Sequence, residues 1–422
     1  MGQRPLIRNF ALLAALILFA GSGVIHSTAA TKAGAPCTKA GKISISGGKK
    51  FTCIKSGKKL IWNKGVATKP APNKTPTAAT SPSPSPSTAS PSPSATIEEL
   101  IYPTSKEVEI LDRLVENAFK TAQPKSADVD FQIGPGQESA EIGLISKAVL
   151  DQALRAASIL DLDINIPIKI YVGNRDWLTP KMPAGTWCAD PIIGAPGSGS
   201  AGFCGIENGV IFMSVDGFLE ESGQRIKRDF SKGADRFLIS YSFAHEIFHL
   251  IQGVAAQKYA NTKGFYNPFW LNEGGANFGA MMTQAVIFQV PFSTIRIYIA
   301  SYSSCVIGSK PALLKDFITN AGQRDNCGPY YYGYLWSEYL VAKTGDIGAL
   351  TNLAKADSTV ASALFYDPAK EFEYNEKKLA LSLKTIYQLD FEDFVTGAQR
   401  YSDSATSQFD AWLKAGKPLL PK

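Results

Sequence analysis

Residues 237–252 read FLISYSFAHEIFHLIQ, an apolar run that carries His245, Glu246 and His249. An apolar run of this length predicts a buried helix. Two histidines four residues apart share one face of such a helix, where both imidazoles can bind one metal ion. Glu246 lies beside them, in the position of a general base. The run therefore predicts a buried, metal-binding helix in the body of the protein.

A third ligand is expected further along the chain. Residues 270–278 read WLNEGGANF and begin 21 residues after His249, and they place a carboxylate at Glu273. The chain has three histidines, and His26 lies in a predicted targeting segment, so His245 and His249 are the two histidines of the mature protein. Two histidines and one carboxylate form a catalytic zinc set that leaves a position open for water.

The pattern H-E-x-x-H followed by W-x-x-E-G-x-A resembles the signature of the gluzincins, the zinc metallopeptidases that include thermolysin and the zinc aminopeptidases. The resemblance implies Zn²⁺ as the cofactor and Glu273 as the third metal ligand. It implies hydrolysis of peptide bonds by a zinc-activated water, with Glu246 as general base. It also implies a gluzincin-like α+β body, in which a small mixed sheet and the active-site helix precede a helical lobe.

The chain departs from the gluzincin pattern at one position. Members of that group often have an acid four residues after the ligand Glu, where it hydrogen-bonds the first histidine, but this chain has Asn277 there. Its amide oxygen is expected to accept the imidazole N–H of His245 instead, which makes the ligand less basic. The metzincin alternative fails because no third histidine follows His249.

A metallopeptidase also needs a group that stabilises the oxyanion. No histidine is left for this role, so a Tyr or an Arg must take it. Residues 328–336 read GPYYYGYLW, which resembles the Y-x-x-G helix start of aminopeptidase-like gluzincins. The resemblance implies Tyr330, with Tyr331 as the alternative because three consecutive tyrosines leave the register open. The competing interpretation is an aromatic packing cluster.

Residues 205–208 read GIEN, which faintly resembles the G-x-M-E-N segment of zinc aminopeptidases, where the Glu, here Glu207, would bind a free amine. A tight turn at Asn208-Gly209 explains these residues more simply. An endopeptidase is therefore favoured over an aminopeptidase. The strand that follows, 210–215, is expected to be a sheet edge that pairs with an extended peptide.

The remaining pattern of the body is that of an α+β protein. Thr104 and Glu107 have the spacing of a capping box and predict a helix start. A second helix is expected over 139–160 and a strand over 166–172, with a further strand over 209–215. Beyond Ser231 the pattern is mostly helical.

Three segments precede the body of residues 97–422. Residues 1–30 resemble a signal peptide, with Arg4 and Arg8 before an apolar run too short for a comfortable membrane span. An uncleaved anchor is the alternative, and no stable membrane span is expected after cleavage. Residues 31–65 predict a small basic β module, because short strands alternate with Gly-Gly and Ser-Gly turns. Residues 66–96 form a Ser/Pro-rich linker.

Six cysteines support export. They form three local pairs along the sequence, and nearest-neighbour pairing predicts the disulfides Cys37–Cys53, Cys188–Cys204 and Cys305–Cys327. No C-x-x-C motif is present, which argues against a cysteine zinc site. Disulfides are typical of oxidising compartments, so the protein is expected to be secreted or associated with the cell envelope.

Charge is divided unevenly along the chain. Residues 1–96 hold 13 of the 43 Lys and Arg and no Asp or Glu, so the body carries a net charge of −7. Nucleic acid is therefore not expected as a partner. The basic module is expected either to bind an anionic cell-envelope polymer or to act as a solvated spacer. A peptide or protein is the expected substrate. The alternatives are a zinc-binding but inactive envelope protein and a zinc hydrolase of a non-peptide bond.

Overall fold

The computed structural model describes most of the body and part of the N-terminal module. The described residues are 34–36, 43–46, 49–56, 59–64, 66–67, 103–186, 188, 201–221, 224–260, 268–307, 313–315, 327–361, 364 and 370–420. The chain divides into two compact units, Met1–Ala95 and Thr96–Lys422, each with its own fold. The predicted signal peptide and most of the linker lie outside the described residues.

The first unit is a small antiparallel sheet. Its strands are β1 (Ile43–Ser46), β2 (Lys49–Ser56), β3 (Lys59–Trp62) and β4 (Val66–Ala67), and β2 pairs with the other three. Phe51 and Cys53 lie two residues apart on β2, so their side chains share one face of the strand, and both are buried. β4 extends the sheet to Ala67, two residues beyond the predicted end of the module at residue 65.

The body contains a four-stranded mixed sheet. Its order is β5 (Val129–Ile133), β6 (Ile168–Gly173), β8 (Val210–Ser214) and β7 (Ala201–Phe203). The first three strands are parallel, and β7 is antiparallel to β8. The prediction that 210–215 is a sheet edge is wrong, because β8 lies between two strands. Among the described residues, the short strand β7 is the edge on that side.

The two faces of this sheet have different partners. Ile211 and Met213 face the main core, where α2 (Gln137–Ile159) packs on β5 and β6 and α5 (Gly233–Ala260) packs on β7 and β8. Val210 and Phe212 face a smaller cluster that includes the Cys188–Cys204 disulfide. This alternation is the period-two pattern of a strand covered on both faces.

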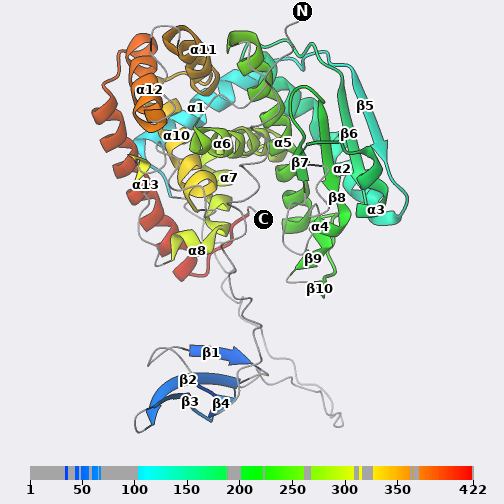
Figure 1. The fold of residues 1–422 in the computed structure, drawn as a ribbon, viewed down its shortest axis with the longest axis vertical. Helices are drawn as coiled ribbons and strands as arrows, with labels where there is room; N and C mark the ends of the chain where they lie inside the picture. The colour runs from blue at the N-terminus through cyan, green and yellow to red at the C-terminus, as the bar shows by residue number, and fades with distance from the viewer. Residues whose placement is uncertain are drawn as a thin grey trace, which may run out of the picture. The chain divides into compact units, whose positions relative to one another are not determined.

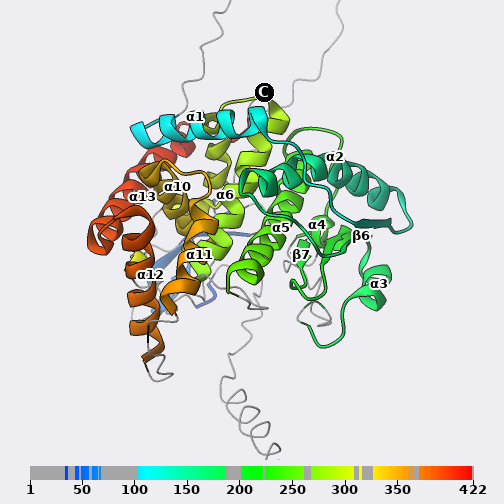
Figure 2. The ribbon, with the colours of Figure 1, turned by 90° about the horizontal axis from the view of Figure 1, so that it is seen from above.

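The rest of the body is helical, so the α+β prediction is confirmed as a mostly helical protein with small sheets. Figure 1 shows the sheet on one side of the body and the late helices on the other, and Figure 2 shows the same division from above. The long helices are α1 (Lys106–Thr121), α6 (Phe269–Phe288), α10 (Gly333–Thr344), α11 (Ala349–Ala361), α12 (Glu371–Tyr387) and α13 (Phe391–Lys414). The short elements are α3 (Arg175–Leu178), η1 (Thr179–Lys181), α4 (Val215–Leu219), β9 (Glu220–Glu221), β10 (Gln224–Arg225), α7 (Phe292–Ile295), η3 (Arg296–Ser301), α8 (Ser303–Val306) and η4 (Cys327–Tyr332).

Helix α6 lies at the centre of the body, between α5 and α10. It approaches α5 closely because Gly279 has no side chain: a Cβ there would lie 1.9 Å from the ring of Phe248. Trp270 and Trp336 pack edge to face between α6 and α10. This close packing fixes the positions of the two helices that carry the predicted metal ligands.

Two of the three predicted disulfides are present, Cys188–Cys204 and Cys305–Cys327. The third involves Cys37, which lies outside the described residues.

Helix α1 is capped by Ser105 and not by the predicted Thr104, one residue earlier. The side chain of Ser105 accepts a hydrogen bond from the amide of Val108. Within the described part of the chain, no single helix is long and apolar enough to cross a membrane, and only the pair Trp270–Phe288 and Phe292–Ser301, bent by 114°, passes that test together.

Candidate metal centre

Three side chains from α5 and α6 converge on one point inside the body. His245 and His249 lie one turn apart on α5, and Glu273 lies in the first half of α6. The Nε2 atoms of the two histidines are 2.9 Å apart, and each is 3.3 Å from Oε2 of Glu273. All three residues are buried. The structure therefore brings together every predicted metal ligand.

The spacing of these atoms fits a small metal ion. Zinc bonds to His and carboxylate ligands are about 2.0–2.1 Å long, and tetrahedral geometry then separates the ligand atoms by about 3.3 Å. The observed separations of 2.9–3.3 Å match this arrangement. The group is thus a buried His-His-Glu set that could hold a metal ion.

The electrostatics of the group favour an anionic Glu273. Burial alone would raise the pKa of its carboxyl, but the charges and hydrogen bonds of His249 and His245 outweigh burial and hold the pKa well below its usual range. Burial alone would lower the pKa of His249, yet Glu273 overrides it and raises the pKa of His249 to about 9. Without a metal ion, the proton on His249 balances the charge of Glu273, and a metal ion that binds here would displace that proton.

No protein-family model, curated protein or solved structure matches this chain.

The residue that orients His249 was not predicted from the sequence. Nδ1 of His249 lies 2.9 Å from Oε1 of Gln252. The amide nitrogen of Gln252 donates to the carbonyls of Leu271 and Asn272, at 3.2 and 3.0 Å. These bonds leave Oε1 as an acceptor, so His249 donates from Nδ1 and presents Nε2 to the metal position. Its place three residues after His249 on the same helix is the signal that could have identified it.

Asn277 does not have the role predicted for it. Its Oδ1 accepts the hydroxyl of Tyr241, and its Nδ2 donates to the backbone carbonyl of Tyr330 at 2.8 Å. Nδ1 of His245 is buried and has no hydrogen-bond partner among the described residues. Tyr241 lies one turn before His245 on α5 and occupies the amide oxygen that His245 was expected to use.

The three predicted catalytic residues lie in different places relative to the metal group. Glu246 is buried beside it, and burial is the main cause that raises its pKa, while the backbone of Phe203 in β7 hydrogen-bonds its carboxylate. The Tyr330 ring stacks on the His245 imidazole with centroids 6.3 Å apart. Tyr331 is directed elsewhere, because its hydroxyl bonds Thr406 in α13. Of the two tyrosines, Tyr330 is therefore the one at the metal group.

The environment of Tyr330 keeps its phenol protonated. Burial is the main cause that raises its pKa far above the usual value, and the carboxylates of Glu273 and Glu246 raise it further. A protonated phenol is a hydrogen-bond donor, which is what oxyanion stabilisation requires.

Glu207, considered above as an amine ligand, is exposed in the turn between β7 and β8. In this turn the amide of Asn208 donates to the carbonyl of Gly205 at 3.2 Å, and Gly209 has a left-handed φ of 59°. The hairpin-turn interpretation is the one that the structure shows.

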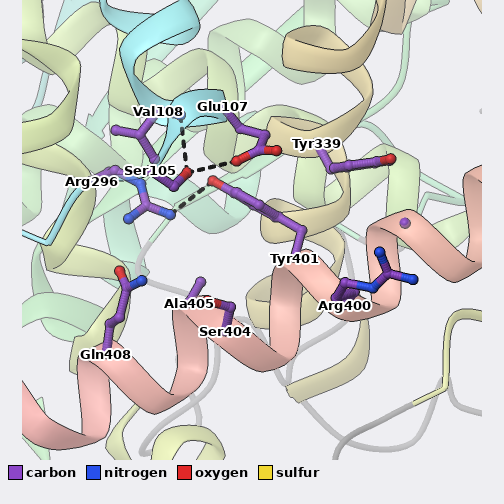
Figure 3. A pocket seen from close by; sticks show the side chains of 11 residues that line it. Ser105, Glu107, Val108, Arg296, Tyr339, Arg400, Tyr401, Ser404, Ala405 and Gln408 are labelled. Carbon is purple, nitrogen blue, oxygen red and sulfur yellow. Dashed lines mark hydrogen bonds between the residues drawn. The ribbon is translucent and has the colours of Figure 1, made fainter.

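A separate cavity lies between α1, α10 and α13 (Figure 3). Its volume is about 270 Å³, and its lining includes Arg296 and Tyr401 but none of the three residues of the metal group. Arg296 is fully buried there in a two-pronged pair with Glu338, at 2.9 and 2.6 Å. Tyr401 bonds both members of the pair. This ion pair joins three helical elements and is distinct from the metal centre.

Proposed function

We propose that the chain is a secreted zinc metallopeptidase of the gluzincin type. The observation that carries the proposal is the convergence of His245, His249 and Glu273 on one buried point with the ligand spacing of tetrahedral zinc. Two histidines and a carboxylate leave a fourth position for a water molecule. The motif H-E-x-x-H with a distant Glu on a second helix agrees with this assignment.

The side chains around the metal group supply the other functions that peptide hydrolysis needs. A bound zinc ion would act as a Lewis acid on a water molecule and on the scissile carbonyl. Glu246 takes the proton as general base and returns it to the leaving amine. Its buried position raises its pKa, which suits a group that must both accept and release a proton. Tyr330 donates a hydrogen bond to the oxyanion.

The sheet edge beside Glu246 supports a peptide as substrate. β7 is a short edge strand, and the backbone of its residue Phe203 contacts Glu246. An extended peptide can add to such an edge through backbone hydrogen bonds. Glu207 is exposed in the following turn, so no observation favours an amine-binding carboxylate. We therefore favour an endopeptidase.

The test is a comparison of the mature chain with its Glu246→Gln variant. Bound metal per molecule is measured beside cleavage of a quenched, mixed-sequence peptide library. We expect about one zinc per chain in both proteins. We expect cleavage in the wild type and its loss in the variant, because the variant keeps the ligands and lacks the base.

The other outcomes point elsewhere. Metal without cleavage in the wild type would favour an inactive zinc-binding protein or a non-peptide substrate. Absence of metal from correctly oxidised protein would contradict the proposal itself. Cleavage that persists at the wild-type rate in Glu246→Gln would exclude Glu246 as the base.

A further inference from the structure

Three aromatic rings form a nearly parallel stack that ends on the metal group. The Tyr302 ring lies 6.4 Å from the Tyr330 ring with an interplanar angle of 15°, and the Tyr330 ring lies 6.3 Å from the His245 ring at 22°. Tyr330 is thus held between a metal ligand and a second tyrosine. Tyr302 was not singled out in the sequence, and the proposed chemistry gives it no role.

The segments that carry Tyr302 and Tyr330 are joined covalently. Tyr302 precedes Cys305 by three residues, and the amide of Cys305 donates to the carbonyl of Tyr302 at 2.8 Å. Cys327 opens the π-helical turn η4, which carries Tyr330 three residues later. The disulfide Cys305–Cys327 therefore connects the segment of Tyr302 directly to that of Tyr330. Single π-helical turns are rare and occur often at functional sites.

A third support comes from α6, the helix that carries Glu273. The side chain of Asn277 donates to the backbone carbonyl of Tyr330 at 2.8 Å. Asn277 lies one turn after Glu273, so the same helix positions a metal ligand and the tyrosine backbone. Ring stacking, the disulfide and this hydrogen bond all act on the place of Tyr330 relative to the metal group.

We propose that Tyr302 is a positioning residue which, together with the Cys305–Cys327 disulfide, holds the Tyr330 phenol at the metal group. The inference rests on the proposed peptidase function, in which Tyr330 stabilises the oxyanion. In this assignment Tyr302 does not contact the reacting carbonyl. Its ring limits the motion of Tyr330 on the side away from His245, and its hydroxyl hydrogen-bonds the side chain of Asn277, which holds the Tyr330 backbone.

Kinetics of Tyr302 variants test this role. Tyr302→Ala should lower kcat about tenfold or more with KM changed less than twofold and with the metal content unchanged, because only the oxyanion donor is misplaced. Tyr302→Phe keeps the ring and loses only the hydrogen bond to Asn277, so it should retain most of the activity. Tyr171→Ala is the matched control, because this tyrosine lies on β6, packs against Trp177 and has no place in the stack, and it should leave kcat unchanged.

A double-mutant cycle shows whether Tyr302 acts through Tyr330. In a Tyr330→Phe background, Tyr302→Ala should cause no further loss of kcat, since the group that it positions is already absent. Equal losses in both backgrounds would overturn the proposal, and so would a Tyr302→Phe variant as impaired as Tyr302→Ala. Loss of metal in Tyr302→Ala would also overturn it, because Tyr302 would then support the metal ligands.

Amide hydrogen exchange tests, without any assay of activity, whether the Cys305–Cys327 disulfide holds the segment of Tyr330 in place. In the double variant Cys305→Ser/Cys327→Ser, exchange over 327–332 should rise about tenfold or more, while exchange in α5 and α6 stays unchanged. The double variant Cys188→Ser/Cys204→Ser is the control and should leave 327–332 unchanged. If the wild type cleaves no peptide, the proposed function fails, but this measurement still tests whether the disulfide positions the Tyr330 segment. Unchanged exchange over 327–332 in the Cys305→Ser/Cys327→Ser variant would overturn that role of the disulfide.

Discussion

The side-chain amide of Gln252 orients the imidazole of His249. Gln252 accepts from its Nδ1 and is itself fixed by two backbone carbonyls of α6. Such outer partners set the orientation of a ligand and its basicity, and their loss commonly weakens metal binding about 10- to 100-fold. Gln252 therefore also couples the helix of the histidines to the helix of Glu273.

We predict that Gln252→Ala lowers zinc affinity about 10- to 100-fold, because His249 loses its orienting acceptor. Competition against a chromophoric chelator measures the effect. Gln252→Glu is the matched variant, because it keeps an acceptor for His249 but removes the donor to Leu271 and Asn272. Its zinc affinity should lie between those of the wild type and Gln252→Ala. Wild-type affinity in Gln252→Ala would show that the contact is incidental.

At the residue scale, the sequence predicts what depends on spacing along one chain segment. His245, Glu246 and His249 follow from helical periodicity, and Glu273 follows from a motif. Gln252 lies three residues after His249 on the same helix, so local spacing could have identified it. Tyr302 could not be predicted in this way, because its role depends on contacts across elements. The predicted role of Asn277 was wrong for a related reason: Tyr241, whose proximity is not evident from the sequence, occupies its oxygen.

The distance between two packed helices depends on a few close contacts. Gly274 on α6 faces Gly333 at the start of α10, and a Cβ at Gly274 would lie 2.0 Å from the Gly333 backbone. The opposing atom is main chain, which cannot move aside as a flexible side chain can. We expect the separation of these helices to control the position of Glu273, the neighbour of Gly274.

Gly274→Ala is therefore expected to displace Glu273 and to lower the zinc occupancy. It should also lower the free energy of unfolding by about 2 kcal/mol or more. Metal content and the midpoint of thermal unfolding measure the two effects. Gly253→Ala on α5 is the control, because its Cβ would meet only the side chain of Ile206, at 3.3 Å or more. Equal behaviour of the two variants would contradict this account.

The buried pair of Arg296 and Glu338 joins η3 to α10, and Tyr401 extends it to α13. Removing one member leaves an uncompensated charge in the core. Glu338→Gln should lower the free energy of unfolding by about 3–5 kcal/mol, measured by denaturant titration. The double variant Arg296→Met/Glu338→Leu should recover most of the loss, because it removes both charges. A double variant as unstable as the single one would show that shape, and not charge, is critical there.

The sequence predicted the order of elements well and their neighbours less well. Residues 139–160 and 166–172 form α2 and β6 nearly as expected, because their periodicity is local. The strand 210–215 was predicted as an edge, yet β7 covers it. The three residues of β7 are too short to give a periodic signal, so strand order at that side was not visible in the sequence.

The whole molecule consists of two units of opposite charge. The first unit carries exposed lysines at positions 55, 59 and 64, and no acidic residue precedes Glu98. The body is net acidic. We propose that the first unit binds an anionic polymer of the cell envelope, because counterion release favours such binding at low salt.

The prediction is retention of the mature chain on an immobilised linear polyphosphate at low salt, with an affinity that falls steeply as salt increases. Lys55→Gln/Lys59→Gln/Lys64→Gln should weaken binding while peptide cleavage stays unchanged. Lys120→Gln/Lys232→Gln/Lys414→Gln, in the body, removes the same charge and should leave binding unchanged. Equal weakening by both triple variants would indicate a general charge effect in place of a binding surface.

The shortage of histidine has a practical consequence for the metal centre. A chain that begins at Lys32 contains two imidazoles, and both are in the group that converges on Glu273. A nitrogen-15 histidine label would therefore report on this centre and on nothing else in the protein. His249 would show an Nδ1 proton bonded to an amide oxygen, whereas His245 would show an Nδ1 without an acceptor. The spectrum of one labelled amino acid can thus follow metal uptake, ligand by ligand, with no assay of catalysis.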